Sequence, residues 1–228
     1  MQLSEAVQSH TRDLIISGEL PVGSFIRLDR LAEELNISVT PVREGLLRLR
    51  GSGLVELAPR RGFVVAPFGP DDIRDLFVAQ GLLAGELAKR ATSRFTDADV
   101  DELAKHHEAL KAAALDRRVA DVEEYNHRFH RKINTGAGAP KIATLLRTGT
   151  QYVPTHFFSS QPEWVDASIR EHEKILWGLR EREPELVRVK MNDHITHAGE
   201  LLAAHLAEQR LRNSGGLDQT ATAEPADS

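Results

Sequence analysis

The chain has 228 residues, 41% of them hydrophobic and 28% charged, which excludes wholesale disorder and suits one large or two small domains at about 150 residues each. It has ten histidines and no cysteine, so disulfides, thiol catalysis and cysteine-ligated metals are excluded, and any transition-metal site must use imidazole and oxygen ligands. No apolar run approaches the ~20 residues of a transmembrane helix, and the first residues lack the pattern of a signal peptide, so we expect a cytoplasmic protein without a membrane partner.

The chain opens with segments that predict three helices. Apolar residues at helical spacing indicate helices over residues 3–16 and 28–35. Ser38 then caps a third helix, which has Pro41 in its first turn, where proline is tolerated, and which continues to Gly51 or Gly53. Two short helices joined by a turn form a helix-turn-helix pattern.

A β-hairpin is predicted next, from two β-rich runs, Leu54–Ala58 and Phe63–Ala66, on either side of a basic turn that contains glycine. Three helices and a hairpin make a winged helix, which we assign to residues 1–67, with Arg60 and Arg61 at the tip of the wing. The overall charge of −5 argues against a nucleic-acid partner, but residues 39–68 carry five arginines against two glutamates. This local excess is compatible with DNA binding, because phosphate attraction acts over about 10 Å.

From Asp71 onward the pattern is helical, after a linker at residues 68–70. We expect an all-helical domain over residues 71–211 and, from its Gly-, Ala-, Thr- and acid-rich composition, a disordered tail over 212–228. The fold class is therefore mainly α, with a winged helix-turn-helix followed by a helical bundle. The helices predicted after the linker cover residues 71–93, 96–115, 118–134, 140–158, 166–182 and 184–210.

Several short motifs occur in a fixed order along the chain. The first part contains ISGELPVG (16–23), LAEELNISVTPVRE (31–44), GLVE (53–56) and RGFVV (61–65), and the second contains FH (129–130), EHEKIL (171–176) and MNDH (191–194). Taken together, over about residues 5–205, they resemble the GntR-type bacterial transcription regulators, in the FadR-like branch with an FCD effector domain. The resemblance implies a homodimer, not an enzyme, that binds a double-stranded DNA operator through two winged helices. It also implies that a small molecule bound in the helical domain changes the affinity for DNA.

The resemblance places DNA contacts on the third helix and on the wing. Ser38, Thr40 and Arg43 would reach bases, since an arginine can bind guanine O6 and N7, and Arg43 would lie on the exposed side of the helix, opposite Leu46 and Leu47. The candidates for phosphate contacts are Arg48, Arg60 and Arg61, with Gly62 in the wing.

One residue of the third helix departs from the family pattern. Family members usually have arginine where this chain has Val39. Valine cannot donate a hydrogen bond, although it can touch a thymine methyl group. We therefore expect an operator that differs from the usual half-site of the family.

A divalent metal site is expected in the helical domain. Asn126 and His130 are four residues apart on one helix, and His172 and His194 lie on two others. Spacing alone favours ordinary histidines, but the resemblance matches these four positions to the FCD metal site, for Zn²⁺ or Ni²⁺. Asparagine stands where aspartate is more usual, which should weaken metal binding. The remaining histidines are expected to be solvated, with His127 and His197 as weak alternates: His10, His106, His107, His127, His156, His197 and His205.

The resemblance also bears on the effector. Many relatives carry an arginine at the position of Gln80, which can hold a ligand carboxylate, whereas glutamine cannot neutralise one. The ligand, expected to be a small carboxylate metabolite, would then be held mainly through the metal or would be less acidic than in relatives. Alternatively, Arg147 would supply the charge.

Three functions remain open at this point. A ligand-responsive regulator, more often a repressor, explains both parts of the chain. A metal sensor would use the metal itself as the effector. A metal-dependent hydrolase would need a general base and leaves the winged helix unexplained, and the chain has no His-Glu-x-x-His motif.

Overall fold

The computed structural model describes residues 3–149 and 157–217. The chain separates into two compact units, one formed by residues 1–72 with 202–228 and the other by residues 73–201. Within the described residues, no helix is long and apolar enough to span a membrane.

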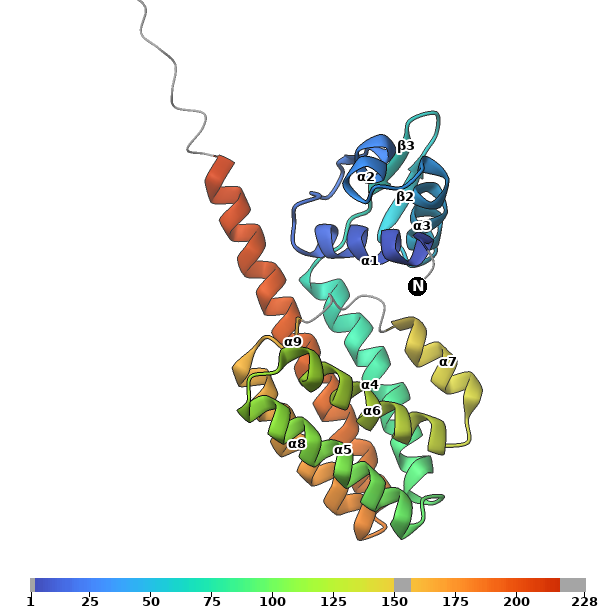
Figure 1. The fold of residues 1–228 in the computed structure, drawn as a ribbon, viewed down its shortest axis with the longest axis vertical. Coiled ribbons are helices and arrows are strands. Elements are labelled where there is room, and N and C mark those ends of the chain that lie inside the picture. The colour runs from blue at the N-terminus through green and yellow to red at the C-terminus, as the bar shows by residue number, and fades with distance from the viewer. Residues whose placement is uncertain (1–2, 150–156, 218–228) are drawn as a thin grey trace, which may run out of the picture. The chain divides into compact units, whose positions relative to one another are not determined.

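The first unit is the expected winged helix. Its helices are α1 (Leu3–Ile16), α2 (Leu28–Glu34) and α3 (Val39–Gly51), and its strands are β1 (Phe25–Ile26), β2 (Val55–Ala58) and β3 (Gly62–Val65) (Figure 1). The sheet has the order β1-β3-β2 with antiparallel pairing, so β3 is central. The sequence predicted the β2–β3 hairpin but not β1, which is too short to show a period-2 pattern.

Side chains from every layer of this unit form its core. Val7 of α1, Leu46 of α3 and Phe63 of β3 are almost completely buried. A Cβ added at Gly45 of α3 would lie 2.7 Å from Val7 Cγ1, so the missing side chain lets α1 and α3 approach closely. The core therefore fixes α3 with its other side free for a partner.

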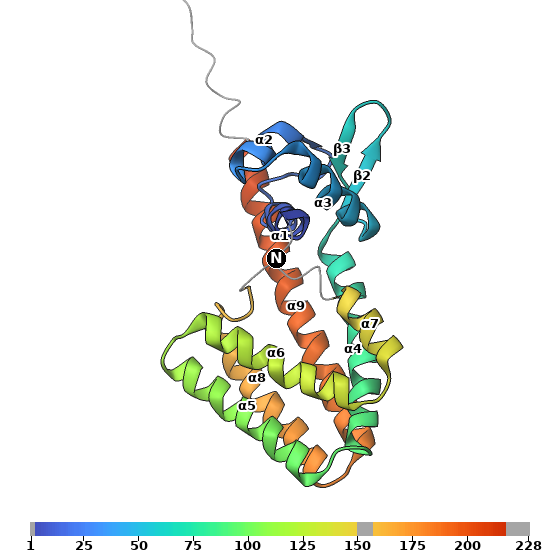
Figure 2. The same cartoon turned by 45° about the vertical axis from the view of Figure 1, so that its right-hand side comes forward.

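The second unit is entirely helical in the residues described, as the sequence predicted. Its residues lie on α4 (Pro70–Thr92), α5 (Asp97–Leu115), α6 (Val119–Gly136), α7 (Pro140–Gly149), α8 (Pro162–Arg180) and α9 (Pro184–Leu217). The start of α4, before residue 73, and the end of α9, from residue 202, belong to the first unit. Helix α5 packs against both α6 and α8 (Figure 2). Leu103, Phe129 and Ile175 from these three helices are completely buried in the core of the unit. This packing brings α6 and α8 together at the level where His130 and His172 project.

Local chemistry explains where some of these helices begin and how closely they pack. Thr96 and Asp99 form a reciprocal capping box at the start of α5. On α4, Gly85 faces α9, and a Cβ there would lie 2.8 Å from the carbonyl oxygen of Arg188. The glycine thus allows α9, which carries His194, to lie directly against α4.

Three predicted helix boundaries are wrong. The helix predicted over 140–158 ends at Gly149; residues 150–156 lie outside the described part, and Phe157–Ser160 form a turn. Helix α8 begins at Pro162 rather than residue 166, because proline is favourable in the first turn. Helix α9 continues to Leu217, past the predicted end at residue 210 and into the predicted tail, whose disorder stays a prediction. The rest of that predicted tail, 218–228, lies outside the described residues.

Candidate functional site

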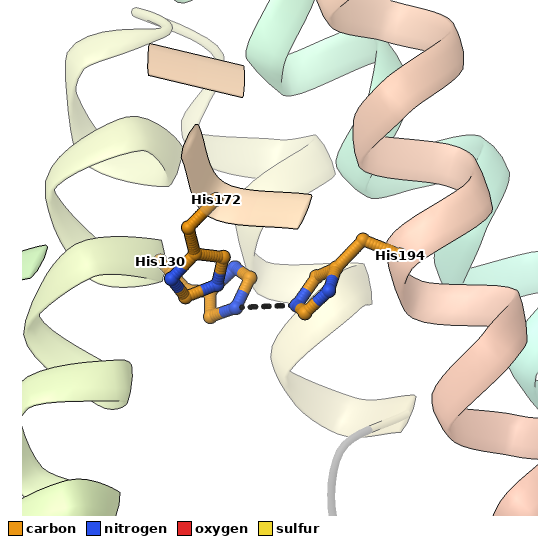
Figure 3. A group of neighbouring side chains, drawn as sticks. All are labelled: His130, His172 and His194. Carbon is orange, nitrogen blue, oxygen red and sulfur yellow. Dashed lines mark hydrogen bonds between the residues drawn. The ribbon is translucent and has the colours of Figure 1, made fainter. Parts of the chain in front are cut away.

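Three histidines from three helices converge in the second unit (Figure 3). His130 lies on α6, His172 on α8 and His194 on α9, and each offers a ring nitrogen within 4.8 Å of the others. His130 Nε2 and His194 Nε2 are 3.2 Å apart. These positions are 64 residues apart in the chain, so the tertiary fold alone brings the rings together.

The 3.2 Å between His130 Nε2 and His194 Nε2 is the separation expected of two ligands of one divalent metal ion. In a tetrahedral site with metal–nitrogen bonds of about 2.0–2.1 Å, two ligating nitrogens lie about 3.3 Å apart. Both ring nitrogens of His172 are buried and have no hydrogen-bond partner among the described residues. A buried polar group without a partner is costly, and a metal would satisfy one of these nitrogens.

Burial keeps the rings of His130 and His172 neutral. Burial is the largest cause that lowers the pKa of His130 and of His172 well below the ordinary value, and the neighbouring His194 lowers both further. Neutral imidazole is the form that donates a lone pair to a metal. Phe129 stacks on the His172 ring at a centroid distance of 3.9 Å and an angle of 7°, which fixes the plane of that ring.

Asn126 has the environment expected of a fourth ligand. It lies one turn before His130 on α6. Its Oδ1 is buried and has no hydrogen-bond partner among the residues described. An amide oxygen is a neutral hard donor, so Asn126 could add oxygen ligation without adding charge.

Glu171 is a residue of this site that the sequence did not identify. Its Oε2 accepts a hydrogen bond of 2.7 Å from His194 Nδ1, and its Oε1 accepts one of 2.9 Å from His197 Nδ1. Burial alone would raise the pKa of Glu171, but the bonds and charges of the two histidines lower it overall. In the sequence, its position directly before His172 was the only signal that pointed to it.

His107 contradicts the expectation of a solvated side chain. It is only 2% exposed, its ring lies 5.8 Å from the His172 ring, and its Nε2 is 3.8 Å from Glu173 Oε1. The position falls on the buried side of α5, in line with Leu103 and Leu110, so helical periodicity could have identified it. Desolvation is the main cause that lowers the pKa of His107.

The remaining histidines that the structure describes lie outside this cluster. His127 and His197 are exposed, as expected, although His197 reaches the site through Glu171. His156 lies outside the described residues. Those of intermediate exposure, rather than fully solvated, are His10, His106 and His205.

The two residues expected to hold an effector differ in their surroundings. Gln80 of α4 is buried, and its Nε2 donates a hydrogen bond of 3.2 Å to the carbonyl oxygen of Gly149 at the end of α7. Arg147 is exposed on α7, two residues before Gly149. Both therefore belong to the region where α4 and α7 meet.

The candidate base contacts lie at the exposed start of α3. Ser38 is the N-cap residue and makes no side-chain capping bond in the described structure, and Thr40 and Arg43, two and five residues further on, are exposed. Leu46 is completely buried, but Leu47 is 42% exposed and so does not lie opposite Arg43. Residues four apart share a face of a helix, so Leu47 adds an apolar group beside Arg43.

The wing presents two exposed arginines in a constrained turn. The backbone of Arg60 has φ +62°, a conformation that favours glycine, and Gly62 follows with φ +93°. The Arg61 guanidinium lies 5.1 Å from the centre of the Phe25 ring, a cation–π contact that ties the wing to β1. On α3, Nη1 of Arg48 lies 4.0 Å from Oε1 of Glu5.

Two family profiles match the chain. The bacterial regulatory proteins of the gntR family match residues 3–65, and the FCD domain matches residues 75–197. The two matches follow the division into a winged helix and a helical unit.

Individual proteins align over most of the chain. The "Glc operon transcriptional activator" of Escherichia coli K12 is 27% identical, over 85% of this chain and 86% of the relative. The "Probable D-xylose utilization operon transcriptional repressor" of Paenarthrobacter nicotinovorans is 28% identical, over 93% of this chain and 92% of the relative. The solved structure "E. coli McbR/YncC" has a TM-score of 0.67 at 22% identity, and the alignment covers 90% of this chain and 99% of that one.

Proposed function

Because the chain belongs to the gntR family of bacterial regulatory proteins and carries an FCD domain, it is a transcriptional regulator, and we propose that a small carboxylate, bound at a divalent metal in the helical unit, controls its affinity for DNA. In this proposal the chain is a homodimeric repressor that releases a double-stranded operator when the carboxylate binds. Zn²⁺ or Ni²⁺ suits a donor set of three imidazoles and one amide oxygen.

The observation that supports the metal site is the convergence of three imidazoles from three helices, one of which, His172, has no hydrogen-bond partner among the described residues. His172 has two buried nitrogens without a hydrogen bond in the described structure, and His130 and His194 point their Nε2 atoms at each other. His130, His172, His194 and Asn126 would hold the ion. When bound, the metal would supply a Lewis-acidic position for an oxygen of the carboxylate ligand.

Gln80 and Arg147, in the region where α4 and α7 meet, would orient the ligand. The carboxamide of Gln80 offers hydrogen bonds but no charge, and the exposed Arg147 offers a guanidinium. A monocarboxylate that depends on the metal for charge neutralisation fits this pair better than a dicarboxylate, which needs a second buried cation.

On the DNA side, the proposal divides the exposed residues by role. Ser38, Thr40 and Arg43 would contact base edges in the major groove from the start of α3. Arg48, Arg60 and Arg61, with the backbone at Gly62, would contact phosphates and so position the winged helix without reading sequence. The homodimer would place two such units on related half-sites.

Ligand binding can change DNA affinity only through a difference in ligand affinity between two arrangements of the dimer. The effector therefore has to bind the DNA-bound and DNA-free forms unequally. Linkage requires the operator to weaken effector binding by the same factor by which the effector weakens operator binding.

Calorimetric titration of small carboxylates, with and without a chelator, tests the proposal. We expect at least one carboxylate to bind the Zn²⁺-loaded protein and to lose binding after metal removal. Fluorescence anisotropy with the selected operator should then show weaker DNA binding when that carboxylate is added. Carboxylate binding that survives metal removal would refute the metal-mediated version, and DNA release by metal alone would identify a metal sensor.

Selection of bound sequences from a random DNA pool tests the role of Val39 and supplies the operator. We expect the selected half-site to differ from the usual family half-site at one position, and the Val39→Arg variant to restore the usual base there. Recovery of the ordinary half-site by the unmodified protein would contradict this expectation.

A further inference from the structure

The carboxylate of Glu171 forms a bridge beside the metal cluster. Glu171 lies on α8, directly before His172, and each of its two oxygens accepts one hydrogen bond from α9. One bond comes from His194, which belongs to the cluster, and the other from His197, one helical turn later. The carboxylate therefore links the helix of one candidate ligand to the helix of another.

We propose that Glu171 is a positioning residue that holds His194 in the tautomer whose Nε2 lone pair faces the metal position. This inference rests on the proposed metal site and adds a residue outside the four candidate ligands. Glu171 touches no metal in this proposal and acts only through the ring of His194.

The argument follows from hydrogen-bond chemistry. An ionised carboxylate only accepts hydrogen bonds, so at 2.7 Å from Oε2 the Nδ1 atom of His194 carries the proton. A ring that carries its proton on Nδ1 has its lone pair on Nε2, the atom that lies 3.2 Å from His130 Nε2. In the other tautomer, an N–H would point into the cluster and compete with the cation.

The same bond also fixes the direction of the ring and makes its free nitrogen more basic. Histidines that bind metals usually donate their second N–H to a carboxylate or carbonyl group, and loss of that partner typically weakens metal binding by about 10–100-fold. Glu171 is the carboxylate that reaches His194 among the described residues, and its half-buried position limits competition from water.

His197 supplies a matched control. It binds the same carboxylate through a bond of 2.9 Å, but its side chain is 43% exposed and it lies outside the metal-ligand cluster. Removal of His197 frees one oxygen of Glu171 to water and leaves the bond to His194. If the bridge only held the two helices together, loss of Glu171 and loss of His197 would weaken Zn²⁺ binding equally. If Glu171 positions His194, only the loss of Glu171 weakens Zn²⁺ binding.

The test compares the full-length wild-type protein with Glu171→Gln and His197→Gln. Glutamine keeps the shape of the side chain but, because an amide can donate as well as accept, it does not dictate the tautomer of His194. Competition for Zn²⁺ against a chromophoric chelator should show about 10–100-fold weaker binding for Glu171→Gln and a change below about threefold for His197→Gln. Equal Zn²⁺ affinity of wild type and Glu171→Gln, or equal losses in both variants, would overturn the inference.

Nitrogen NMR of the histidine rings in the metal-free wild-type protein gives an independent readout that needs no variant to fold. We expect His194 to be protonated on Nδ1 and not on Nε2. The opposite tautomer would overturn the inference even if Zn²⁺ binds. A wild-type protein that binds no Zn²⁺ would instead refute the proposed function, and the inference with it.

Discussion

The two units of this protein present their candidate functional side chains in opposite ways. In the winged helix they are exposed hydroxyls and guanidinium groups, with Arg43, Arg60 and Arg61 open to solvent. In the helical unit, the candidate ligands His172 and His194 are buried, and burial keeps His172 neutral. The winged helix presents positively charged groups suited to the phosphates of DNA. The helical unit presents imidazole lone pairs suited to a metal cation. The contrast teaches that exposure and burial each prepare a different chemistry.

The largest expected effect follows from removal of a candidate metal ligand. His130→Ala should weaken Zn²⁺ binding by more than ~100-fold, because it removes a donor rather than an outer partner. His127→Ala is the matched control, since His127 is an exposed histidine on the same helix, and it should change the affinity by less than about threefold. Chelator competition measures both. Equal losses would mean that burial and convergence do not distinguish these histidines.

The next effect concerns an exposed charge that reads a base. Arg43→Ala should cost about 1–3 kcal/mol of operator binding and relax the sequence preference at one position. Arg61→Ala should instead weaken binding to all sequences and reduce the slope against salt by about one unit. Anisotropy titrations over a range of salt concentrations separate these effects. Arg128→Ala, which removes an exposed arginine of α6 paired with Glu124, is the control and should leave both quantities unchanged.

A smaller effect on Zn²⁺ affinity is expected at Asn126, the candidate ligand that is neutral where aspartate is more usual. Asn126→Asp adds a negative charge at a buried oxygen that has no hydrogen-bond partner among the described residues. Because the number of charged ligands tunes the affinity of a cation site, Zn²⁺ binding should tighten by roughly 10-fold. In the metal-free protein the same charge is buried without a partner, so the variant should be less stable than wild type. Calorimetry and thermal unfolding measure the two results, and unchanged Zn²⁺ affinity would remove Asn126 from the site.

The smallest effect comes from exposed charges outside both sites, which sets the scale for ordinary ion pairs. Lys132 Nζ lies 2.8 Å from Asp99 Oδ1 and 2.6 Å from Glu102 Oε2. Its hydrogen bonds are the largest cause that lowers the pKa of both carboxyl groups. A carboxyl group whose pKa is lowered by folding stabilises the folded protein at pH values above its ordinary pKa, which is 3.8 for Asp99 and 4.5 for Glu102. This stability is lost as the pH falls through the pKa of the folded state.

The difference in Tm between wild type and Lys132→Gln should therefore be small at neutral pH and should narrow as the pH falls from about 5 to about 3. Lys132→Arg keeps the charge and should follow wild type. Thermal unfolding by circular dichroism measures the difference, and a pH-independent gap would contradict the assignment of the stability to this ion pair.

Local patterns were enough to predict most of the fold. The position of Ser38, with Pro41 in the first turn, correctly indicated the start of α3, and the basic turn between two β-rich runs correctly indicated the β2–β3 hairpin. The all-helical second unit followed from apolar periodicity. Strand β1 and the ends of α7 and α9 were missed, because a two-residue strand has no period and Gly215 and Gly216 predict an end that the helix does not have.

The candidate site was predictable only in part. The motifs around His130, His172 and His194 pointed to these histidines through a family resemblance, and the structure does bring the three rings together. The sequence did not indicate that Glu171 bonds to His194 or that His107 lies beside His172, because both contacts join residues on different helices. Neither the periodicity nor a motif of one helix indicates which side chains of another helix will contact it.

By itself, then, the sequence determined which groups this protein can use: imidazole, amide and carboxylate for a cation, and guanidinium and hydroxyl for DNA, with no thiol. It also determined the helices that carry them, since capping and periodicity are local. Only the tertiary structure decided that His130, His172 and His194, among ten histidines, lie together, and that burial lowers the pKa of His130 and His172. The physical reason is that burial sets both the pKa of a ring and its neighbours, and burial arises only when α6, α8 and α9 pack together.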